Sequence, residues 1–192
     1  YSGNKITSDG GHIKLYRESQ YGDNNLIYKY NSKNELEWST SFVKSGSVNM
    51  HDIEEMANGV YYAVGSAGGT LTISSDMMEN SEEDFKLDAN TMYPILIKLN
   101  KNGKVISVEK IGNYLESGDL IRIKTLKDGT YIVYGVFNKN LEFSENDTES
   151  KEVINITGDV IIHYNKNGKV IRAMQLSDKS LRGFEILNAE LD

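Results

Sequence analysis

The stretch KLNKNGKVIS, residues 98–107, decides the fold class, because a near copy recurs as HYNKNGKVIR, residues 163–172. A third, more distant version is KYNSKNELEW, residues 29–38. In each copy an apolar stretch ends at an asparagine, a short polar turn follows, and a second strand-like stretch begins. Asn-Gly at 102–103 and 167–168 predicts a hairpin with a type I′ turn, in which both central residues have positive φ.

The repetition extends beyond this hairpin. The segment MHDIEEMANGVYYAVG (50–65) aligns with LIRIKTLKDGTYIVYG (120–135), and each predicts another strand, turn and strand. Two such hairpins give four short antiparallel strands in up-and-down order, and no segment keeps the 3.6-residue apolar period of a helix. We predict one all-β repeat domain over 1–192, with copies at approximately 1–49 (partial), 50–118, 119–182 and, as the start of a further copy, 183–192.

Stretches such as ILIKL (95–99) and TYIVYGVF (130–137) carry apolar side chains on both faces. A lone four-stranded sheet would leave one face in water, so neighbouring sheets must cover it. Radial stacking of four-stranded sheets does this and defines a β-propeller. Three copies are too few for a ring of typically four to eight blades. We favour part of a longer propeller over an open arc or a ring completed by identical chains.

Between the repeated hairpins the chain is more variable. In the segment 136–159, the stretches NLEFS (140–144) and EVINIT (152–157) alternate apolar and polar residues. We predict that they form an extra hairpin on the edge of the third sheet.

The order of these elements resembles the propeller-type repeats of bacterial secreted and cell-surface proteins. The residues that fit this repeat are Lys98, Asn100, Gly103, Lys104, Val105, Asp128, Gly129, Tyr131, Val133 and Gly135. Trp38 fits its aromatic position, whereas Ser107 and Arg172 depart from it. The resemblance covers most of the chain outside the variable segments. It implies an extracellular or cell-surface location in a bacterium, neighbouring repeats in a longer parent chain, and a binding module or an uncharacterised surface protein.

The composition excludes several classes of function. Lys and Arg number 21 against 28 Asp and Glu, a net charge of −7, which argues against nucleic acid as a partner because phosphate binding needs concentrated positive charge. The absence of cysteine excludes disulfides, thiol nucleophiles and zinc–thiolate sites. The longest apolar runs are strand-sized, so we expect no insertion into a membrane. The first residues show no signal-peptide pattern.

The histidines do not predict a metal or catalytic centre. None has a metal-binding spacing; they are His12, His51 and His163. The last occupies the strand position of Lys29 and Lys98, which predicts an ordinary strand histidine. Asp52 next to His51 could orient the imidazole, but no motif supplies a nucleophile.

Adjacent carboxylates at 54–55, 82–84 and 145–147 are interpreted as solvated surface. A glycosidase holds two carboxylates at a set separation across a cleft, and strand alternation sends Glu54 and Glu55 to opposite faces. We predict no catalytic residue, no metal ligand and no cofactor. Calcium, which takes clustered oxygen ligands, is left open for the loops 79–88 and 144–149.

The aromatic residues are the most suggestive class, with 12 Tyr, 5 Phe and 1 Trp. Equivalent positions hold Tyr30 and Tyr164, and Tyr61 and Tyr62 are predicted to face Tyr131 across the copies, as inter-sheet packing requires. Loops on a rigid scaffold also carry binding residues. The loop candidates for stacking on a sugar or peptide are Tyr16, Tyr21, Tyr93 and Tyr114.

The leading hypothesis is a non-catalytic propeller module of a bacterial surface or secreted protein. It would bind a glycan or protein partner or act as a structural spacer. One alternative is a carbohydrate-active enzyme on a propeller scaffold, which would gather two carboxylates and a cationic or aromatic neighbour in one pocket. Another is a lectin completed by oligomerisation.

Overall fold

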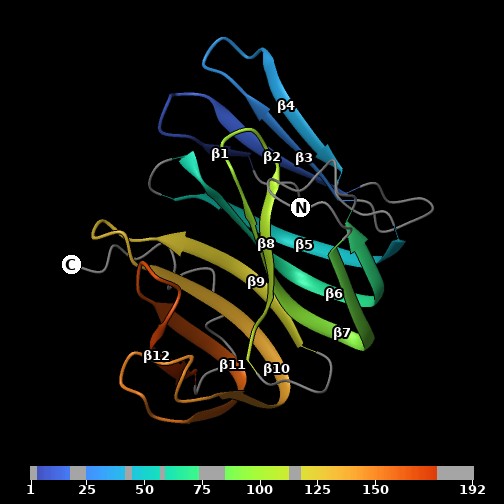
Figure 1. The fold of residues 1–192 in the computed structure, drawn as a ribbon. Helices are drawn as coiled ribbons and strands as arrows, with labels where there is room; N and C mark the ends of the chain where they lie inside the picture. The colour runs from blue at the N-terminus through green and yellow to red at the C-terminus, as the bar shows by residue number, and fades with distance from the viewer. Residues whose placement is uncertain are drawn as a thin grey trace.

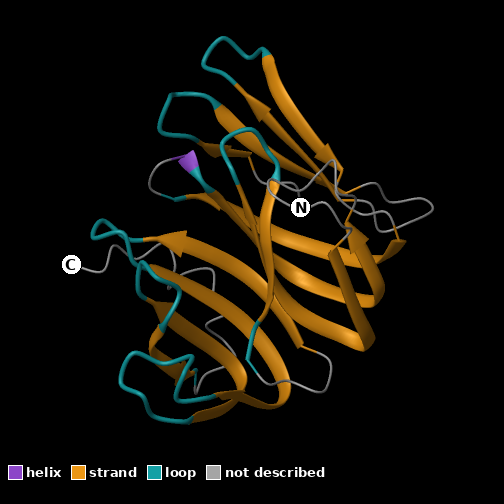
Figure 2. Ribbon diagram, in the orientation of Figure 1, coloured by secondary structure: helices purple, strands orange, loops and turns teal. Residues whose placement is uncertain are grey.

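The computed structural model describes residues 4–17, 25–41, 45–56, 59–73, 85–112 and 118–176. Within these ranges the chain forms twelve β-strands and no α-helix. Strands dominate the ribbon in Figure 2, and its short purple segment is a 3-10 turn. The same ranges therefore contain no helix long and apolar enough to cross a lipid bilayer. The predicted all-β class is confirmed.

The strands form three four-stranded sheets, each antiparallel with neighbouring strands consecutive in the chain (Figure 1). Sheet A contains β1 (Asn4–Ile6), β2 (His12–Arg17), β3 (Asn25–Tyr30) and β4 (Leu36–Ser41). Sheet B contains β5 (Ser45–Glu55), β6 (Tyr61–Ile73), β7 (Phe85–Leu99) and β8 (Val105–Lys110). Sheet C contains β9 (Gly118–Thr125), β10 (Tyr131–Phe143), β11 (Ile154–Tyr164) and β12 (Val170–Gln175).

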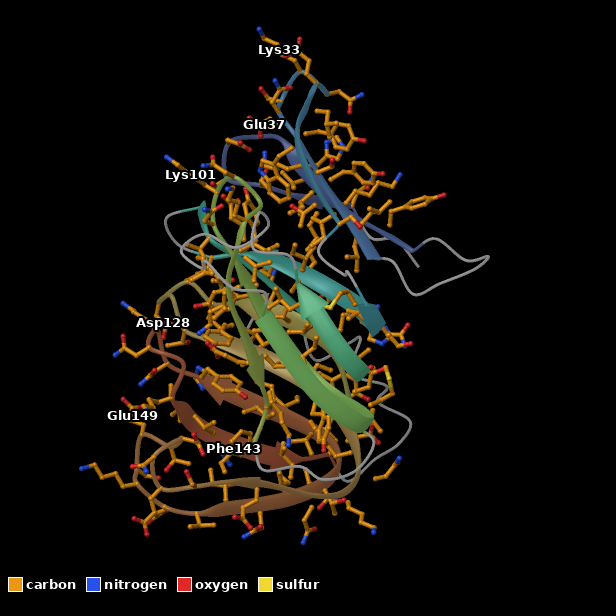
Figure 3. The ribbon with its side chains drawn as sticks, turned by 45° about the vertical axis from the view of Figure 1, so that its right-hand side comes forward. Lys33, Glu37, Lys101, Asp128, Phe143 and Glu149 are labelled. Atoms are coloured by element: carbon orange, nitrogen blue, oxygen red, sulfur yellow. The ribbon has the colours of Figure 1, made fainter. Side chains whose placement is uncertain are left out.

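The sheets stack face to face in the order A, B, C, as an open arc and not a closed ring (Figure 1). One hairpin turn from each sheet lies along the same side of the stack, as Lys33, Lys101 and Asp128 show in Figure 3. The predicted blades of four antiparallel strands are therefore present. The segment 183–192, expected to open a further copy, lies outside the described residues.

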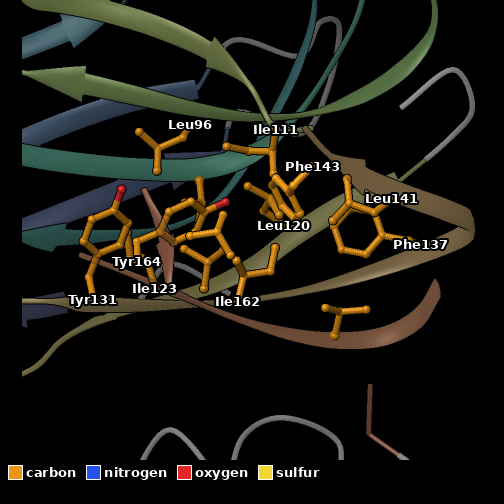
Figure 4. Close-up of a cluster of buried hydrophobic side chains, with 14 residues drawn as sticks. Leu96, Ile111, Leu120, Ile123, Tyr131, Phe137, Leu141, Phe143, Ile162 and Tyr164 are labelled. Atoms are coloured by element: carbon orange, nitrogen blue, oxygen red, sulfur yellow. The ribbon is translucent and has the colours of Figure 1, made fainter. Parts of the chain in front are cut away.

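The stacking buries two large apolar clusters, one in each interface between sheets. Between A and B, the cluster contains Ile13 and Ile27 of sheet A with Ile95 and Ile97 of sheet B. Between B and C, Leu96 meets a larger set of side chains from sheet C (Figure 4). Full burial of one such aliphatic side chain contributes about 2 kcal/mol, so face-to-face stacking is the main source of stability.

The hairpin turns differ from the predicted type I′ turns. Only the glycine of each Asn-Gly pair has positive φ, with Gly103 and Gly168 both at 79°. The amide of Gly103 donates to the Asn100 carbonyl and the amide of Asn100 donates to the Lys104 carbonyl. This is a type I turn followed by one left-handed residue. In the first copy Asn34, with φ of 64°, takes the place of the glycine.

The asparagine before each turn has a mechanical role. The Asn100 Oδ1 atom accepts hydrogen bonds from the amides of Asn102 and Lys104, at 2.9 and 3.0 Å. Asn31 and Asn165 accept the two equivalent bonds in the other copies. An asparagine side chain that binds the backbone in this way fixes the turn, which explains its recurrence at all three positions.

The stretches 140–144 and 152–157 pair with each other as predicted, but they do not form an extra hairpin on the edge of the sheet. Residues Leu141–Phe143 are the end of β10 and pair with Ile154–Ile156 at the start of β11. Both strands lie in the middle of sheet C, in the order β12-β11-β10-β9. The alternating pattern therefore marks an extension of two central strands, after a register shift between Phe137 and Leu141.

Candidate functional site

The first strands of the three sheets bring charged residues together. Lys5 in β1 places its Nζ atom 2.6 Å from Glu54 Oε2 in β5, and Lys124 Nζ in β9 lies 3.7 Å from Glu54 Oε1. The three residues occupy matched register positions, opposite Ile13, Tyr62 and Ile132 of the second strands. We call Lys5, Glu54 and Lys124 the ionic row, in which the sign of the charge alternates from sheet to sheet.

Asp52 strengthens this junction. Its Oδ1 atom accepts from the amide of Ile53 at 3.0 Å, and its Oδ2 atom accepts from the amide of Ile123 at 3.0 Å. Lys5 Nζ donates to Asp52 and also to the carbonyl of Ile123, at 3.3 Å. Side chains and backbone of all three sheets therefore meet around Lys5 and Asp52.

The ionic row differs from the predicted solvated surface at 54–55. The Glu54 side chain is only 13% exposed and is paired with two ammonium groups. Glu55 instead accepts hydrogen bonds from the amide and hydroxyl of Ser8, at 2.5 and 2.8 Å. The carboxylates gather with lysine, as the enzyme alternative requires, but their charges are matched by protein cations and amides. Such an arrangement is a structural ion-pair network.

His51 is oriented by a carboxylate that the sequence did not indicate. Its Nε2 atom lies 2.7 Å from Asp119 Oδ2, so the partner comes from β9 of the next sheet. The neighbouring Asp52, the sequence-based candidate for orienting this imidazole, binds Lys5 and two amides instead. The His51–Asp119 pair is thus a second polar link between sheets B and C.

A buried ammonium in sheet A is held by carboxylates of the same sheet. Lys29, 1% exposed, donates from Nζ to Asp9 Oδ2 at 2.9 Å, to Glu37 Oε2 at 3.0 Å and to the carbonyl of Tyr30 at 3.0 Å. Burial alone would lower the pKa of Lys29, but the hydrogen bonds to Asp9 and Glu37 outweigh it and raise this pKa. The hydrogen bond from Lys29 also holds the pKa of Asp9 well below its usual range.

The equivalent positions in the other sheets are also paired. Lys98 forms an ion pair with Glu109 and lies over the ring of Tyr62, with Nζ 5.3 Å from the centroid. His163 places Nε2 2.8 Å from the Thr130 hydroxyl. This agrees with the predicted structural role of His163.

The most exposed aromatic surface lies on sheet A. Side chains alternate along β2 and β3, and because Ile13 and Ile27 face sheet B, their neighbours point away from it. We call this surface the outer face of sheet A; it comprises Ile6, His12, Lys14, Tyr16, Leu26, Tyr28 and Tyr30. Tyr16 is 46% exposed and Ile6 is 86% exposed. No other described sheet lies against this face.

The rings of the outer face are ordered by mutual contacts. His12 and Tyr30 stack with centroids 4.8 Å apart and planes 11° apart. Tyr28 stacks on Tyr30 at 6.3 Å and 29°. Parallel rings at these distances stabilise one another, and each ring has an apolar body and a polar tip.

Of the four sequence-predicted binding tyrosines, the two that the structure describes lie in different sheets. Tyr16 lies in β2 and Tyr93 lies in β7, so the expected loop placement is wrong for both. The ring of Tyr93 is covered by Lys110, whose Nζ atom lies 4.0 Å from its centroid. Tyr21 and Tyr114 lie outside the described residues. Ligand binding by these tyrosines stays a prediction.

Part of the outer face was missed at the sequence level. Tyr30 was assigned to inter-sheet packing and Tyr28 was assigned no role. The contact predicted between Tyr62 and Tyr131 is confirmed, at 5.3 Å and 88°. Tyr61, also predicted to face Tyr131, instead contacts Trp38 of sheet A at 5.6 Å, because neighbouring residues of a strand point to opposite faces. A signal for the outer face exists in the sequence: Tyr28 and Tyr30 alternate with Ile27 and Lys29 on one strand, which separates two faces of different character.

The described residues contain no group of three His, Asp or Glu side chains suited to a metal ion. In the loop 144–149, the Asp147 Oδ2 atom accepts from the amide and hydroxyl of Ser144, at 2.9 and 2.6 Å, and so caps a turn. The side chains of the other loop, 79–88, lie outside the described part. Calcium binding is therefore untested.

Comparison with known proteins adds no identity: no protein-family model matches the chain, and no curated protein is similar to it.

Proposed function

We propose that this chain is a non-catalytic binding module of a bacterial surface or secreted protein, which holds a protein partner on the outer face of sheet A. The observation that carries the proposal is the set of stacked, partly exposed rings of His12, Tyr28 and Tyr30 on a face that points away from the other sheets. Tyrosine provides a large contact area with little loss of side-chain entropy, and aromatic residues are enriched at protein interfaces.

The non-catalytic part of the proposal is supported by the ionic row. Asp52 and Glu54 converge between the sheets, where they pair with Lys5 and Lys124 and accept hydrogen bonds from backbone amides. A carboxylate held in this way stabilises the stack. The bacterial surface location rests on the resemblance of the repeat.

A protein partner is favoured over a glycan by the shape and size of the face. The rings lie on two adjacent strands of an open sheet, flanked by the aliphatic Ile6 and Leu26. Sugars are usually held in concave sites with convergent polar groups, whereas a flat apolar centre with a polar rim suits another protein.

The proposal is tested with fragments of the source genome displayed on phage and the whole chain as bait. Fragments retained by the wild type and lost with Tyr28→Lys support it, and Lys166→Glu, on an exposed turn of sheet C, is the matched control. A glycan array run with the same three proteins decides the alternative. Glycan binding that requires Tyr28, without any retained protein fragment, would overturn the proposal. Release of sugar from a polysaccharide, abolished by Glu54→Gln, would overturn its non-catalytic part.

A further inference from the structure

The outer face of sheet A occupies the same repeat positions as two buried interfaces. In each sheet, one face points toward the preceding sheet in the order A, B, C, and we call it the leading face. The second and third strands pair His12 with Tyr30 in sheet A, Tyr61 with Leu99 in sheet B, and Tyr131 with Tyr164 in sheet C. The pairs in sheets B and C are buried against the preceding sheet.

The rings of sheet A match those of sheet C in geometry as well as in position. Tyr131 and Tyr164 stack at 4.9 Å and 9°, against 4.8 Å and 11° for His12 and Tyr30. Sheet B supplies Tyr62, which contacts Tyr131 edge-on at 5.3 Å.

The A–B interface uses a related contact. Trp38 of sheet A meets Tyr61 of sheet B at 5.6 Å and 66°. In both described interfaces an aromatic ring of the preceding sheet therefore contacts a ring of the leading face at a steep angle. The stacked pair on sheet A is placed to make the same kind of contact.

The ionic row adds a charge requirement. Glu54 of sheet B lies between Lys5 and Lys124. Asp52 of sheet B accepts from the amide of Ile123 in sheet C, and Asn4 holds the position of Ile123 in sheet A. A preceding sheet of the same kind as sheet B would place one carboxylate near Lys5 and another near the amide of Asn4, so the alternation of charge would continue.

We infer that the outer face of sheet A binds a further four-stranded antiparallel sheet of this repeat, of the kind formed by β5–β8. That sheet presents an aromatic ring to the His12–Tyr30 stack and a carboxylate to Lys5. The inference rests on the proposed function, because it names the class of protein that the outer face holds.

The test extends the whole chain by one sheet. Because Asn4 aligns with Ile123, joining residue 119 of an added copy of 45–119 to residue 1 keeps the repeat spacing. Nitration by tetranitromethane, read by mass spectrometry, reports the accessibility of Tyr16 and Tyr28. We expect both rates to fall in the extended chain toward the rate of the buried Tyr131 in the same molecule.

The matched control changes the added copy alone. Tyr62→Lys with Leu96→Lys places two charges on its face toward sheet A, and Tyr16 and Tyr28 should then react as fast as in the unextended chain. Equal rates in all three proteins, with amide protection in the added sheet, would overturn the inference. If the added sheet shows no amide protection, the added copy is replaced by residues 1–49 with Lys5→Glu, which present Trp38 together with a carboxylate at the position of Glu54. Unprotected tyrosines in that chain too would overturn it.

Two outcomes separate this inference from the proposed function. In the first, the displayed fragments that bind the outer face lack this repeat, and Tyr28 is not protected in the extended chain. This result would overturn the inference and leave the proposed function standing. Protection of Tyr28 that rises with the concentration of the unextended chain would assign the face to a second copy and would also overturn it.

Discussion

Tyr164 is fully enclosed between sheets B and C, yet its hydroxyl has no hydrogen-bond partner among the described residues. Burial raises the pKa of Tyr164 well above its ordinary value. A buried hydroxyl without a partner costs about 1–3 kcal/mol of desolvation. Its ring nevertheless stacks on Tyr131 and fills the apolar cluster.

We expect Tyr164→Phe to raise the free energy of unfolding by about 1 kcal/mol, because it removes the unpaired hydroxyl and keeps the ring. Tyr134→Phe is the matched control, since the Tyr134 hydroxyl donates to Asp159 Oδ1 at 2.7 Å. That change should lower stability by about 1 kcal/mol. Urea denaturation of the two variants checks the signs. A loss of stability in Tyr164→Phe would mean that its hydroxyl is paired.

The ion pair of Lys29 with Asp9 leads us to expect that its contribution to stability depends on pH. A carboxyl whose pKa is depressed by folding stabilises the native state above its unfolded pKa, about 3.9 for Asp, and this stabilisation is lost as pH falls. Asp9 is such a group, with Lys29 as the leading cause. Lys29→Met should lower stability at pH 7 by about 1–2 kcal/mol. The deficit should shrink below about pH 4.

Urea titrations of wild type and Lys29→Met at a series of pH values measure this deficit. Lys33→Met, on an exposed turn, is the control and should change stability by less than about 0.5 kcal/mol. Stability curves that stay parallel down to acid pH would show that Asp9 does not depend on Lys29.

At the scale of the element, the hairpin turns are alike in backbone and different in surroundings. Gly103 and Gly168 share the same φ. A Cβ atom on Gly103 would lie 2.5 Å from the Trp38 ring and 2.7 Å from Thr40 Oγ1, whereas the nearest atom to one on Gly168 is 3.7 Å away. The Gly103 turn is therefore also a contact between sheets, and its carbonyl accepts from the Thr40 hydroxyl at 2.7 Å.

Gly168→Ala should cost about 1 kcal/mol, the penalty for a left-handed residue with a Cβ atom. Gly103→Ala should cost about 1–3 kcal/mol more, because the added methyl group overpacks the contact with Trp38. Thermal unfolding of both variants gives the difference. Equal losses of stability in the two variants would show that the Gly103 turn is not tightly packed against sheet A.

How far the elements could be predicted depends on the kind of signal. The repeated hairpins can be predicted because their turns require particular residues. The Asn100 side chain binds two amides of the turn, and Gly103 has a positive φ, so Asn and Gly recur at these positions. Tyr93 was misplaced because β7 begins at Phe85, inside a polar and variable stretch. Strand pairing with a neighbour decides such segments more than their own propensity does.

At the scale of the whole molecule, the ionic row shows that contacts between sheets are missed when each segment of the sequence is interpreted by itself. Aligned copies carry Asp52 against Arg122 and Glu54 against Lys124, so opposite charges at equal positions were a visible sign of contact. Lys5 completes the row from a strand of only three residues, too short for a periodic pattern. The binding tyrosines and the partner stay predictions, because a local sequence pattern does not specify the shape of a binding partner.

Glu54→Gln should lower stability by about 1–2 kcal/mol, because it leaves two ammonium groups with less compensation in a largely buried place. Glu35→Gln, on an exposed turn where Asn31 donates to the side chain, should change stability by less than about 0.5 kcal/mol. Urea denaturation is measured at low salt and at about 1 M salt, where the Debye length is about 3 Å. The comparison separates the ionic contribution of Glu54 to stability from its other contributions. A Glu54 deficit that salt does not reduce would argue against an ionic origin.

The alternation of Lys5, Glu54 and Lys124 also constrains how an array of these repeats can grow. Duplication of a single copy would set two lysines, or two glutamates, side by side in a desolvated place. Duplication of two adjacent copies together would preserve the order of signs. We therefore expect genes that encode such arrays to gain and lose copies in pairs. The charges on the first strands of the sheets would then show which copies were duplicated together.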